Sequence, residues 1–279
     1  MNIQTAINVA NQKLKKNNIF SYKLDSEILM SNVINKNRDY IILNLTQNLS
    51  DLELIDFKKL INERSKGKPI SYLVGKKEFW KYEFEITEGV LIPRPDTELI
   101  IEQVLKFSKN KSKLNILEVG TGSGCLILSI LKEKKDFYGI GIDISKKCID
   151  ISRINSKNLK VDERVKFFKT DVDNFNRGKY DLIISNPPYI KKLDLKYLEK
   201  DINFEPKIAL DGGLEGISEI RKVINKSSEL IKIGGKLILE IAFDQKKEVL
   251  RLLKNKGFYI NKALKDLANN DRCIISTKI

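Results

Sequence analysis

Residues 115–143 read NILEVGTGSGCLILSILKEKKDFYGIGID. This stretch contains a short apolar strand at Asn115–Val119, a glycine-rich turn, an apolar helix and a second strand at 138–142. Further strands and helices alternate after it, with strands at 165–168, 182–185, 236–241, 259–263 and 273–276 and helices at 145–158, 214–232 and 245–256. Strands separated by helices of this length predict an α/β fold with a doubly wound, mostly parallel sheet, whose ligands bind beyond the carboxyl ends of the strands.

The glycine-rich turn lies where such a ligand would bind. Gly120-Thr121-Gly122-Ser123-Gly124 follows the first strand and opens a helix, and glycines let the chain turn sharply and a ligand approach the backbone. Asp143 ends the second strand, where a carboxylate can accept hydrogen bonds from both hydroxyls of a ribose. Together they predict a nucleoside cofactor. The Gly-x-Gly-x-Gly spacing differs from the Gly-x-Gly-x-x-Gly of dinucleotide sites, which favours S-adenosylmethionine but leaves a dinucleotide open.

A second motif, Asn186-Pro187-Pro188-Tyr189, follows the strand at 182–185 and reaches the same edge of the sheet. The two prolines fix their own φ angles and hold Asn186 extended, so its side-chain oxygen and a nearby backbone carbonyl form a rigid pair of acceptors. Such a pair suits a planar amide or amino nitrogen, whose lone pair can then attack a methyl group, while Tyr189 offers an aromatic face to a flat target. The motif predicts methyl transfer to nitrogen by positioning and electrostatics.

Composition narrows the chemistry further. The 279-residue chain has no histidine, which excludes Ser-His-Asp catalysis and histidine-ligated metals, and its three cysteines lack Cys-x-x-Cys spacing. Without a signal-peptide pattern or an apolar run near the roughly 18 residues of a membrane span, we expect a cytoplasmic protein with no metal and no membrane association. The net charge of +14 is spread along the chain, so it either fits an acidic partner or reflects a lysine-rich composition.

The residues that precede the sheet have a different pattern, which predicts helices followed by a hairpin. Apolar residues at helical spacing predict helices from residue 3 and from residue 24, and Ser50-Asp51-Leu52-Glu53 has the pattern of a capping box. Alternating apolar and charged residues at 80–86 predict one strand of a hairpin whose other half includes 72–74. We therefore predict a helical domain at 1–75, a β-hairpin linker at 76–95 and the sheet domain at 96–279; alternatively, the helices flank the larger domain.

These motifs resemble the HemK/PrmC family of protein-(glutamine-N5) methyltransferases, which act on peptide chain release factors. The resemblance extends over most of the chain and includes the segments KPISY at 68–72, EFW at 78–80, LIPRPDTE at 91–98, NPPY at 186–189, FEP at 204–206, ALDGG at 209–213 and KDL at 265–267. It implies a helical N-terminal substrate-recognition domain, a hairpin linker and a seven-stranded, Rossmann-like class I methyltransferase domain.

The resemblance also implies roles for single residues. The turn Gly120 to Gly124 would hold the methionine end of S-adenosylmethionine, Asp143 its ribose, and Asp171-Val172 its adenine, with Asn186 beside the cofactor as well. Asn186, Pro187, Pro188 and Tyr189 would be the catalytic, substrate-binding residues that hold the glutamine amide. The segment from Arg94 to Glu98 would either wall the pocket or cap the helix that follows. Val172 stands where relatives often have a large aromatic residue, and Ala242 and Asn269 stand where glycine is usual.

By this resemblance the substrate is the glutamine of the Gly-Gly-Gln motif of release factors, methylated at N5 in support of translation termination, with S-adenosylhomocysteine as the product. We expect a monomer without direct nucleic-acid binding. Three alternatives are weighed against this reading: a glutamine methyltransferase of a ribosomal protein, an adenine-N6 methyltransferase of nucleic acid, and a cofactor-binding regulatory module without catalysis. The spread charge counts against the nucleic-acid enzyme, which must flip a base and hold phosphates.

Overall fold

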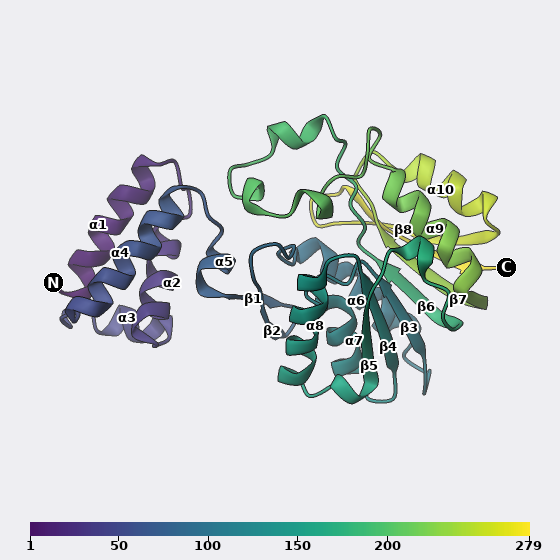
Figure 1. Cartoon of the computed structure of the whole chain (residues 1–279), viewed down its shortest axis with the longest axis horizontal. Helices are drawn as coiled ribbons and strands as arrows, with labels where there is room; N and C mark the ends of the chain where they lie inside the picture. Colours follow the sequence, from purple (N-terminus) through teal and green to yellow (C-terminus); the bar gives the residue numbers. More distant parts are fainter. The chain divides into compact units, whose positions relative to one another are not determined.

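The computed structural model describes residues 1–279 and divides them into two compact units (Figure 1). The helical unit comprises Met1–Lys76 together with the short segment Glu199–Phe204. The sheet unit comprises Lys77–Leu198 and Glu205–Ile279. No helix in either unit is long and apolar enough to cross a lipid bilayer. The functional division predicted at 1–75, 76–95 and 96–279 stays a prediction.

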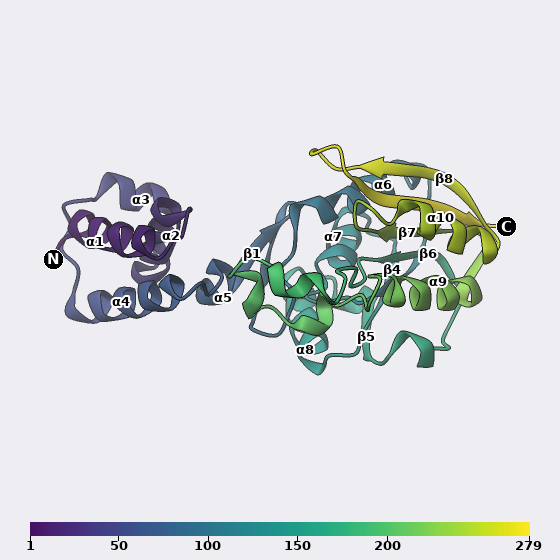
Figure 2. The ribbon, with the colours of Figure 1, turned by 90° about the horizontal axis from the view of Figure 1, so that it is seen from above.

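The helical unit is built on three long helices that lie side by side, as Figure 2 shows for α1, α2 and α4. α4 begins at the predicted capping box, where the Ser50 hydroxyl accepts the Glu53 N–H at 3.3 Å and the Glu53 carboxylate accepts the Ser50 N–H at 2.8 Å, which confirms that prediction. The helices of this unit are α1 (Ile3–Lys16), α2 (Tyr22–Ile34), α3 (Arg38–Leu43), α4 (Asp51–Ser65) and α5 (Ile70–Val74), and their shared core includes Ile3, Leu14, Leu29, Met30, Ile41 and Phe57.

The helical unit contains an ion-pair cluster whose central pair is buried. The Arg64 guanidinium donates to an Asp25 carboxylate oxygen at 2.7 Å and pairs with Asp201 at 2.9 Å. The side chains of Arg64 and Asp25 are only 5% and 7% exposed. Because burial of an unpaired charge is far less favourable than burial of a pair, each of these groups depends on the other. Asp201 belongs to the segment Glu199–Phe204, which is part of the helical unit. The ion pair with Arg64 therefore connects this segment to α4.

The hairpin begins later than predicted. Residues 72–74, predicted as part of a strand, belong to the helix α5, which follows Pro69 and ends at Gly75 with a left-handed φ of 78°. A proline at the start and a glycine at the end are helix signals, and an apolar run of this length fits either a strand or a short helix. The hairpin consists of β1 (Lys76–Phe79) and β2 (Tyr82–Glu85).

The sheet unit contains one seven-stranded sheet in the order β5-β4-β3-β6-β7-β9-β8. The pairs from β5 to β7 are parallel, and β9 runs antiparallel to both β7 and β8, which confirms the predicted α/β fold with a mostly parallel sheet. The strands are β3 (Asn115–Val119), β4 (Tyr138–Asp143), β5 (Val165–Lys169), β6 (Tyr180–Ser185), β7 (Ile231–Glu240), β8 (Phe258–Lys265) and β9 (Asp271–Lys278).

Helices cover both faces of this sheet because the crossovers run outward in two directions from β3 and β6. On one face α6, α7 and α8 pack beside one another, and on the other α9 packs against α10. The strands supply fully buried residues such as Leu117, Ile183 and Leu237 to the core between them. The helices are α6 (Glu98–Phe107), α7 (Cys125–Glu133), α8 (Lys146–Asn158), α9 (Ser218–Leu230) and α10 (Lys246–Asn255).

Replacing Arg64 with methionine should destabilise the helical unit by about 3–5 kcal/mol, because Asp25 would remain buried without its partner. Hydrogen exchange of α1, α2 and α4 amides, followed by mass spectrometry, measures this loss. Arg38→Ala is the matched control, because its ion pair with Glu27 is solvent-exposed and should contribute about 1 kcal/mol or less. Equal protection in the two variants would contradict the prediction.

Candidate active site

A cavity of about 670 Å³ opens at the carboxyl ends of β3, β4, β5 and β6. The sheet order reverses between β3 and β6, which is the place where open α/β sheets bind ligands. Val119 and Ser185 are partners across that pair of strands, so the segments that follow each of them begin side by side. Residues of both sequence motifs line the cavity: Gly120, Thr121, Gly122, Ser123, Asp143, Asp171, Val172, Asn186, Pro187 and Pro188.

The glycine turn presents bare backbone to the cavity. Gly120 and Gly122 have φ angles of +73° and +55°, and no heavy atom lies within 4 Å of the place where either residue would carry a Cβ. A side chain at these positions would be strained and would occupy the space that a ligand could use. Gly124 has a different role, because its Cβ would lie 2.9 Å from Leu128 Cδ1. Gly124 therefore permits close packing at the start of α7.

Asp143 closes the turn from the end of β4. Its Oδ2 accepts the Gly122 N–H at 2.9 Å, and its Oδ1 accepts the Ser145 N–H at 2.9 Å. Burial raises the pKa of Asp143, and these backbone hydrogen bonds oppose the shift. The Ile144 N–H and the Cys148 thiol also hydrogen-bond this carboxylate, so Asp143 holds the turn while it lines the cavity.

Glu118 is a buried carboxylate beneath the turn, and the sequence analysis assigned it no role. It is 2% exposed, and burial raises its pKa to about 8 against the hydrogen bonds that it receives. Thr121 Oγ1 donates to its Oε2 at 2.6 Å, and the Ile127 N–H approaches the same oxygen at 3.4 Å. Glu118 thus ties the turn to α7. Its sequence signal was an acidic residue inside an otherwise apolar strand.

Asp171 and Val172 line another part of the cavity. The Asp171 Oδ1 accepts the Asp173 N–H at 2.9 Å and so begins a short 3-10 turn, Val172–Asn174. Val172 is 8% exposed and packs in the core of the sheet unit, with part of its surface on the cavity. The two residues present a carboxylate and an apolar side chain together, and their contact with adenine stays a prediction.

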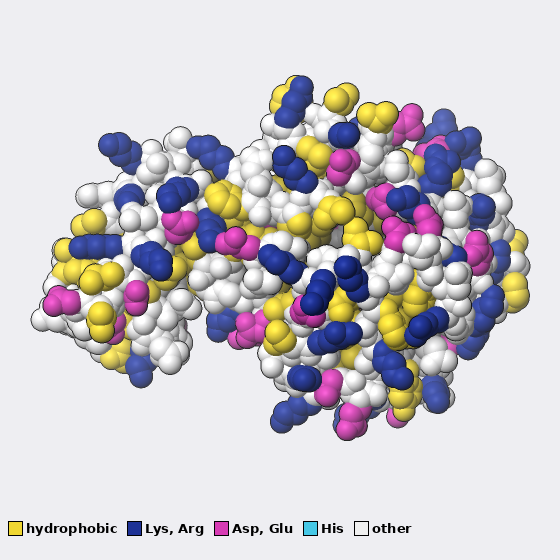
Figure 3. Space-filling view, in the orientation of Figure 1, with side chains coloured by type: hydrophobic (Ala, Val, Ile, Leu, Met, Phe, Trp, Pro, Cys, Tyr) yellow, Lys and Arg dark blue, Asp and Glu magenta, His cyan; other side chains and the backbone are white.

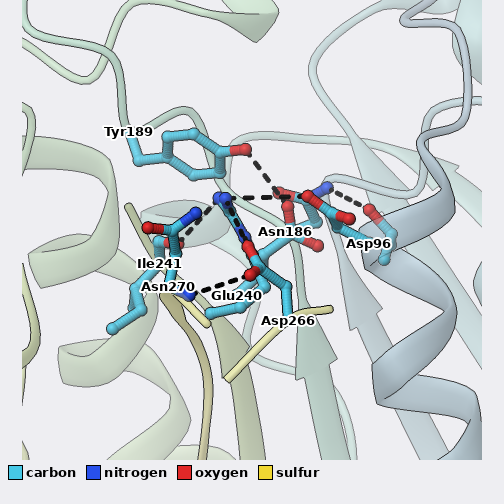
Figure 4. Close-up of polar contacts among 9 residues, drawn as sticks. Asp96, Asn186, Tyr189, Glu240, Ile241, Asp266 and Asn270 are labelled. Atoms are coloured by element: carbon cyan, nitrogen blue, oxygen red, sulfur yellow. Dashed lines mark hydrogen bonds and ion pairs between the residues drawn. The ribbon is translucent and has the colours of Figure 1, made fainter. Parts of the chain in front are cut away.

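Asn186 is the first residue after β6, and its side chain is held by a residue from another part of the chain. The Asn186 Nδ2 donates to Thr97 Oγ1 at 3.0 Å. Tyr189 does not line the cavity; its hydroxyl donates to Glu240 Oε1 at 3.2 Å, and burial raises its pKa. Figure 4 shows the side chains of Asn186 and Tyr189 directed toward the same group of polar residues. Stacking of a substrate on Tyr189 stays a prediction.

Of the two roles that the sequence left open for the segment from Arg94 to Glu98, the structure supports walling of the cavity and shows no side-chain cap on the helix. Arg94 and Thr97 line the cavity, while Pro95–Thr97 form a 3-10 turn that leads directly into α6. Arg94 pairs with Glu205, whose other oxygen accepts the Ile92 N–H at 3.0 Å. The segment therefore walls the cavity and leads into α6 without capping it. The Thr97 hydroxyl makes no capping hydrogen bond to α6.

Sequence reasoning missed the roles of Thr97, Glu205 and Glu240. Thr97 and Glu205 stand in motifs that were noted, but their partners are distant in the sequence: Asn186 is 89 positions after Thr97, and Glu205 is 111 positions after Arg94. Glu240 ends β7 and is 1% exposed. Its only sequence signal was an acidic residue that follows an apolar strand.

Comparisons with known proteins agree with this organisation. Residues 5–75 match the family model described as the PrmC N-terminal domain, and residues 95–203 match the methyltransferase small domain. The release factor glutamine methyltransferase of Clostridium acetobutylicum is 37% identical over 100% of this chain and 99% of its own. The protein of that name from Buchnera aphidicola of Acyrthosiphon pisum is 36% identical over 100% of this chain and 99% of its own.

A solved structure supports the fold alone. The ribosomal protein L11 methylase of Lactobacillus delbrueckii subsp. bulgaricus superposes with a TM-score of 0.52 and 18% identity, over 69% of this chain and 83% of its own. The sheet order, the cavity at its switch point and the methyltransferase small domain define a Rossmann-like methyltransferase. Within that class, the identity along the whole length shows that the chain belongs to the family of release factor glutamine methyltransferases.

Burial of Glu118 predicts a pH-dependent stability. The folded protein keeps a proton on Glu118 up to about pH 8, whereas the unfolded chain loses it near 4.5, so the folded state binds more protons between these values. Stability should therefore fall as the pH rises through this window, by about 1.4 kcal/mol per pH unit from this group. Urea unfolding of wild type and Glu118→Gln between pH 5 and 8 measures the difference.

The exposed Glu163→Gln is the control for that experiment, because it removes a carboxylate without changing a buried site. Its stability should follow that of the wild type across the pH range. Glu118→Gln should show a flatter profile, and a profile parallel to the wild type would show that Glu118 ionises normally in the folded protein.

Proposed function

We propose that this protein transfers a methyl group from S-adenosylmethionine to the side-chain nitrogen N5 of the glutamine in the Gly-Gly-Gln motif of peptide chain release factors. The observation that carries the proposal is the position of Asn186-Pro187-Pro188 on the same cavity as the glycine turn and Asp143. The full-length relatives named release factor glutamine methyltransferase support the choice of substrate. S-adenosylhomocysteine is then the second product.

The residues around the cavity fit S-adenosylmethionine. The open space beside Gly120 and Gly122 admits a ligand against the backbone, which suits the methionine end. Asp143 lines the cavity with a carboxylate, the group that suits ribose hydroxyls, and Asp171 with Val172 offers a polar and an apolar contact for adenine. When bound, S-adenosylmethionine supplies an electrophilic methyl group on its sulfonium sulfur.

The amide nitrogen of glutamine is a weak nucleophile, and the protein has to orient it for attack on the methyl group. The lone pair of an amide nitrogen is conjugated with its carbonyl group, so acceptors must orient the N–H bonds and turn the lone pair toward the methyl group. Asn186 directs its Nδ2 to Thr97, which leaves Oδ1 as the acceptor for the glutamine N–H. Pro187 and Pro188 carry no N–H, so this backbone offers the substrate only carbonyl oxygens. The surplus proton leaves the nitrogen after the transfer.

The helical unit and the surface charge bear on how the protein meets the release factor. The helical unit, which matches the PrmC N-terminal domain, binds the release factor away from the Gly-Gly-Gln tip. Figure 3 shows that Lys and Arg side chains are scattered among acidic ones over the face of the molecule drawn there. This distribution suits a protein partner better than a nucleic-acid backbone. We propose a monomeric enzyme that acts in the cytoplasm, where release factors meet the ribosome, with no metal in its reaction.

Incubation of the protein with S-adenosylmethionine and a purified release factor should add one methyl group to the Gly-Gly-Gln glutamine, detected by mass spectrometry of the peptides. Asn186→Ala should lower kcat by about 100-fold or more, because a positioned polar group at the reacting atoms is removed. Its affinity for S-adenosylmethionine, measured by calorimetry, should change little. A methyl group on another protein would redirect the proposal to that substrate, and equal loss of cofactor affinity would remove Asn186 from its assigned role.

Asp143→Ala should weaken S-adenosylmethionine binding by about 10- to 100-fold, because hydrogen bonds to a charged group contribute about 1.5–3 kcal/mol. Isothermal calorimetry measures the dissociation constant. Asp173→Ala is the matched control, because Asp173 is an exposed aspartate near the same rim and does not line the cavity. If the Asp143 variant bound the cofactor like the wild type, Asp143 would not be the ribose ligand.

A further inference from the structure

A buried carboxylate lies beside the Asn186 loop. β6 and β7 are parallel neighbours, with Ser185 opposite Leu239, so Asn186 and Glu240 are the next residues along the two strands. Glu240 is 1% exposed and does not line the cavity. It therefore acts on the cavity only through the side chains that touch it.

Two residues of the Asn186-to-Tyr189 motif are connected to this carboxylate. Tyr189 donates its hydroxyl proton directly to Glu240 Oε1 at 3.2 Å. Asn186 is connected through Thr97, which accepts the Asn186 Nδ2 proton at 3.0 Å and whose hydroxyl, as a donor to the ionised Glu240 side chain, lowers the pKa of Glu240. Thr97 is 3% exposed, so water does not replace these contacts. Figure 4 shows the Tyr189 hydroxyl directed at Glu240, with Asn186 beside them.

When Glu240 is ionised, the network has a direction, because a carboxylate only accepts hydrogen bonds. Glu240 takes the single proton of the Thr97 hydroxyl, so the Thr97 oxygen is left as an acceptor toward Asn186. A flipped Asn186 amide would place Oδ1 against that oxygen, with no proton between them. The amide orientation with Nδ2 toward Thr97 is thus the one that satisfies both Asn186 and Thr97, while Glu240 Oε2 has no hydrogen-bond partner.

Further charges surround Glu240. Arg272 donates to Asp266 Oδ2 at 3.0 Å, pairs with Asp96 at 3.6 Å, and supplies the positive charge that favours ionised Glu240. Burial raises the pKa of Glu240 to about 7, while the Thr97 hydroxyl, the Arg272 charge and the Tyr189 hydroxyl oppose the shift and Asp96 adds to it. Buried Cys273 lies near enough to feel the carboxylate charge, which contributes to a raised pKa of its thiol.

We propose that Thr97 and Glu240 are positioning residues that set the side-chain orientation of Asn186, so that Oδ1 and not Nδ2 faces the glutamine nitrogen. This inference rests on the proposed function. A reversed Asn186 would present an NH2 group to the substrate NH2 group, and neither could accept the other's protons while the substrate lone pair is directed at the methyl group. The two residues act through Asn186, and Glu240 does not itself touch the substrate.

Steady-state kinetics of Thr97→Val and Thr97→Ser test the proposal. Valine keeps the shape but removes the hydroxyl, so kcat should fall about 10- to 100-fold, the equivalent of losing one hydrogen bond with a charged partner. Serine restores the hydroxyl and should recover most of the wild-type kcat. Cofactor affinity should be unchanged in both variants. Glu240→Gln should also lower kcat, because an amide both donates and accepts and no longer fixes the direction of the Thr97 proton.

Ser227→Ala is the matched control, because Ser227 is a buried serine in α9 whose hydroxyl has no hydrogen-bond partner. It should turn over like the wild type. Wild-type kcat in Thr97→Val would overturn the proposal. So would a fall in kcat that is matched by equal loss of cofactor affinity and thermal stability, because that pattern indicates a structural role only.

An NMR measurement separates failure of this proposal from failure of the proposed function. The Asn186 side-chain NH2 signal, assigned with Asn186→Ala, should exchange slowly with water in the wild type and in Thr97→Ser and rapidly in Thr97→Val. If the wild type methylated no release factor, the proposed function would fail while these signals still reported the orientation. An Asn186 signal that is identical in Thr97→Val and the wild type would overturn the positioning role whatever the substrate.

Discussion

The pairing of β3 with β6 is the constraint on which the site depends. These two strands are distant in the sequence, and the crossovers that begin at them run toward opposite edges of the sheet. Their register places Val119 opposite Ser185, so the glycine turn and Asn186 start next to each other. Because side chains alternate between the faces of a strand, a slip of one residue would move buried Glu118 and Leu117 to the wrong faces, and the apolar core opposes such a slip.

Two buried carboxylates hold the two halves of the site in place. Glu118 lies under the glycine turn and receives the Thr121 hydroxyl, while Glu240 lies beside the Asn186 loop and receives the Tyr189 hydroxyl. Burial raises the pKa of both, which means that the charged form of each is less favourable in the folded protein than in water. A carboxylate accepts several hydrogen bonds at once, however, and so it can hold loops in one conformation where an apolar residue cannot.

The sequence allowed the fold and the local motifs to be predicted because their signals are short-range. The strand-helix alternation, the capping box at Ser50 and the turn at Gly120 each occupy one continuous segment. Thr97 and Glu240 could not be assigned this way, because their roles arise only when β7 and the start of α6 meet the end of β6. The helix at 72–74 was mistaken for a strand because a brief apolar run carries no period of its own.

The chemistry at Asn186 follows from the removal of hydrogen-bond donors. A glutamine NH2 group brings two donors to the site, so any free donor beside it would compete for the same acceptors. Pro187 and Pro188 lack N–H groups, and Thr97 engages the NH2 group of Asn186. What the loop offers to the cavity is then a set of oxygen acceptors held by a rigid backbone. Such a site needs no imidazole base, which explains how a chain without histidine can carry out methyl transfer to an amide nitrogen.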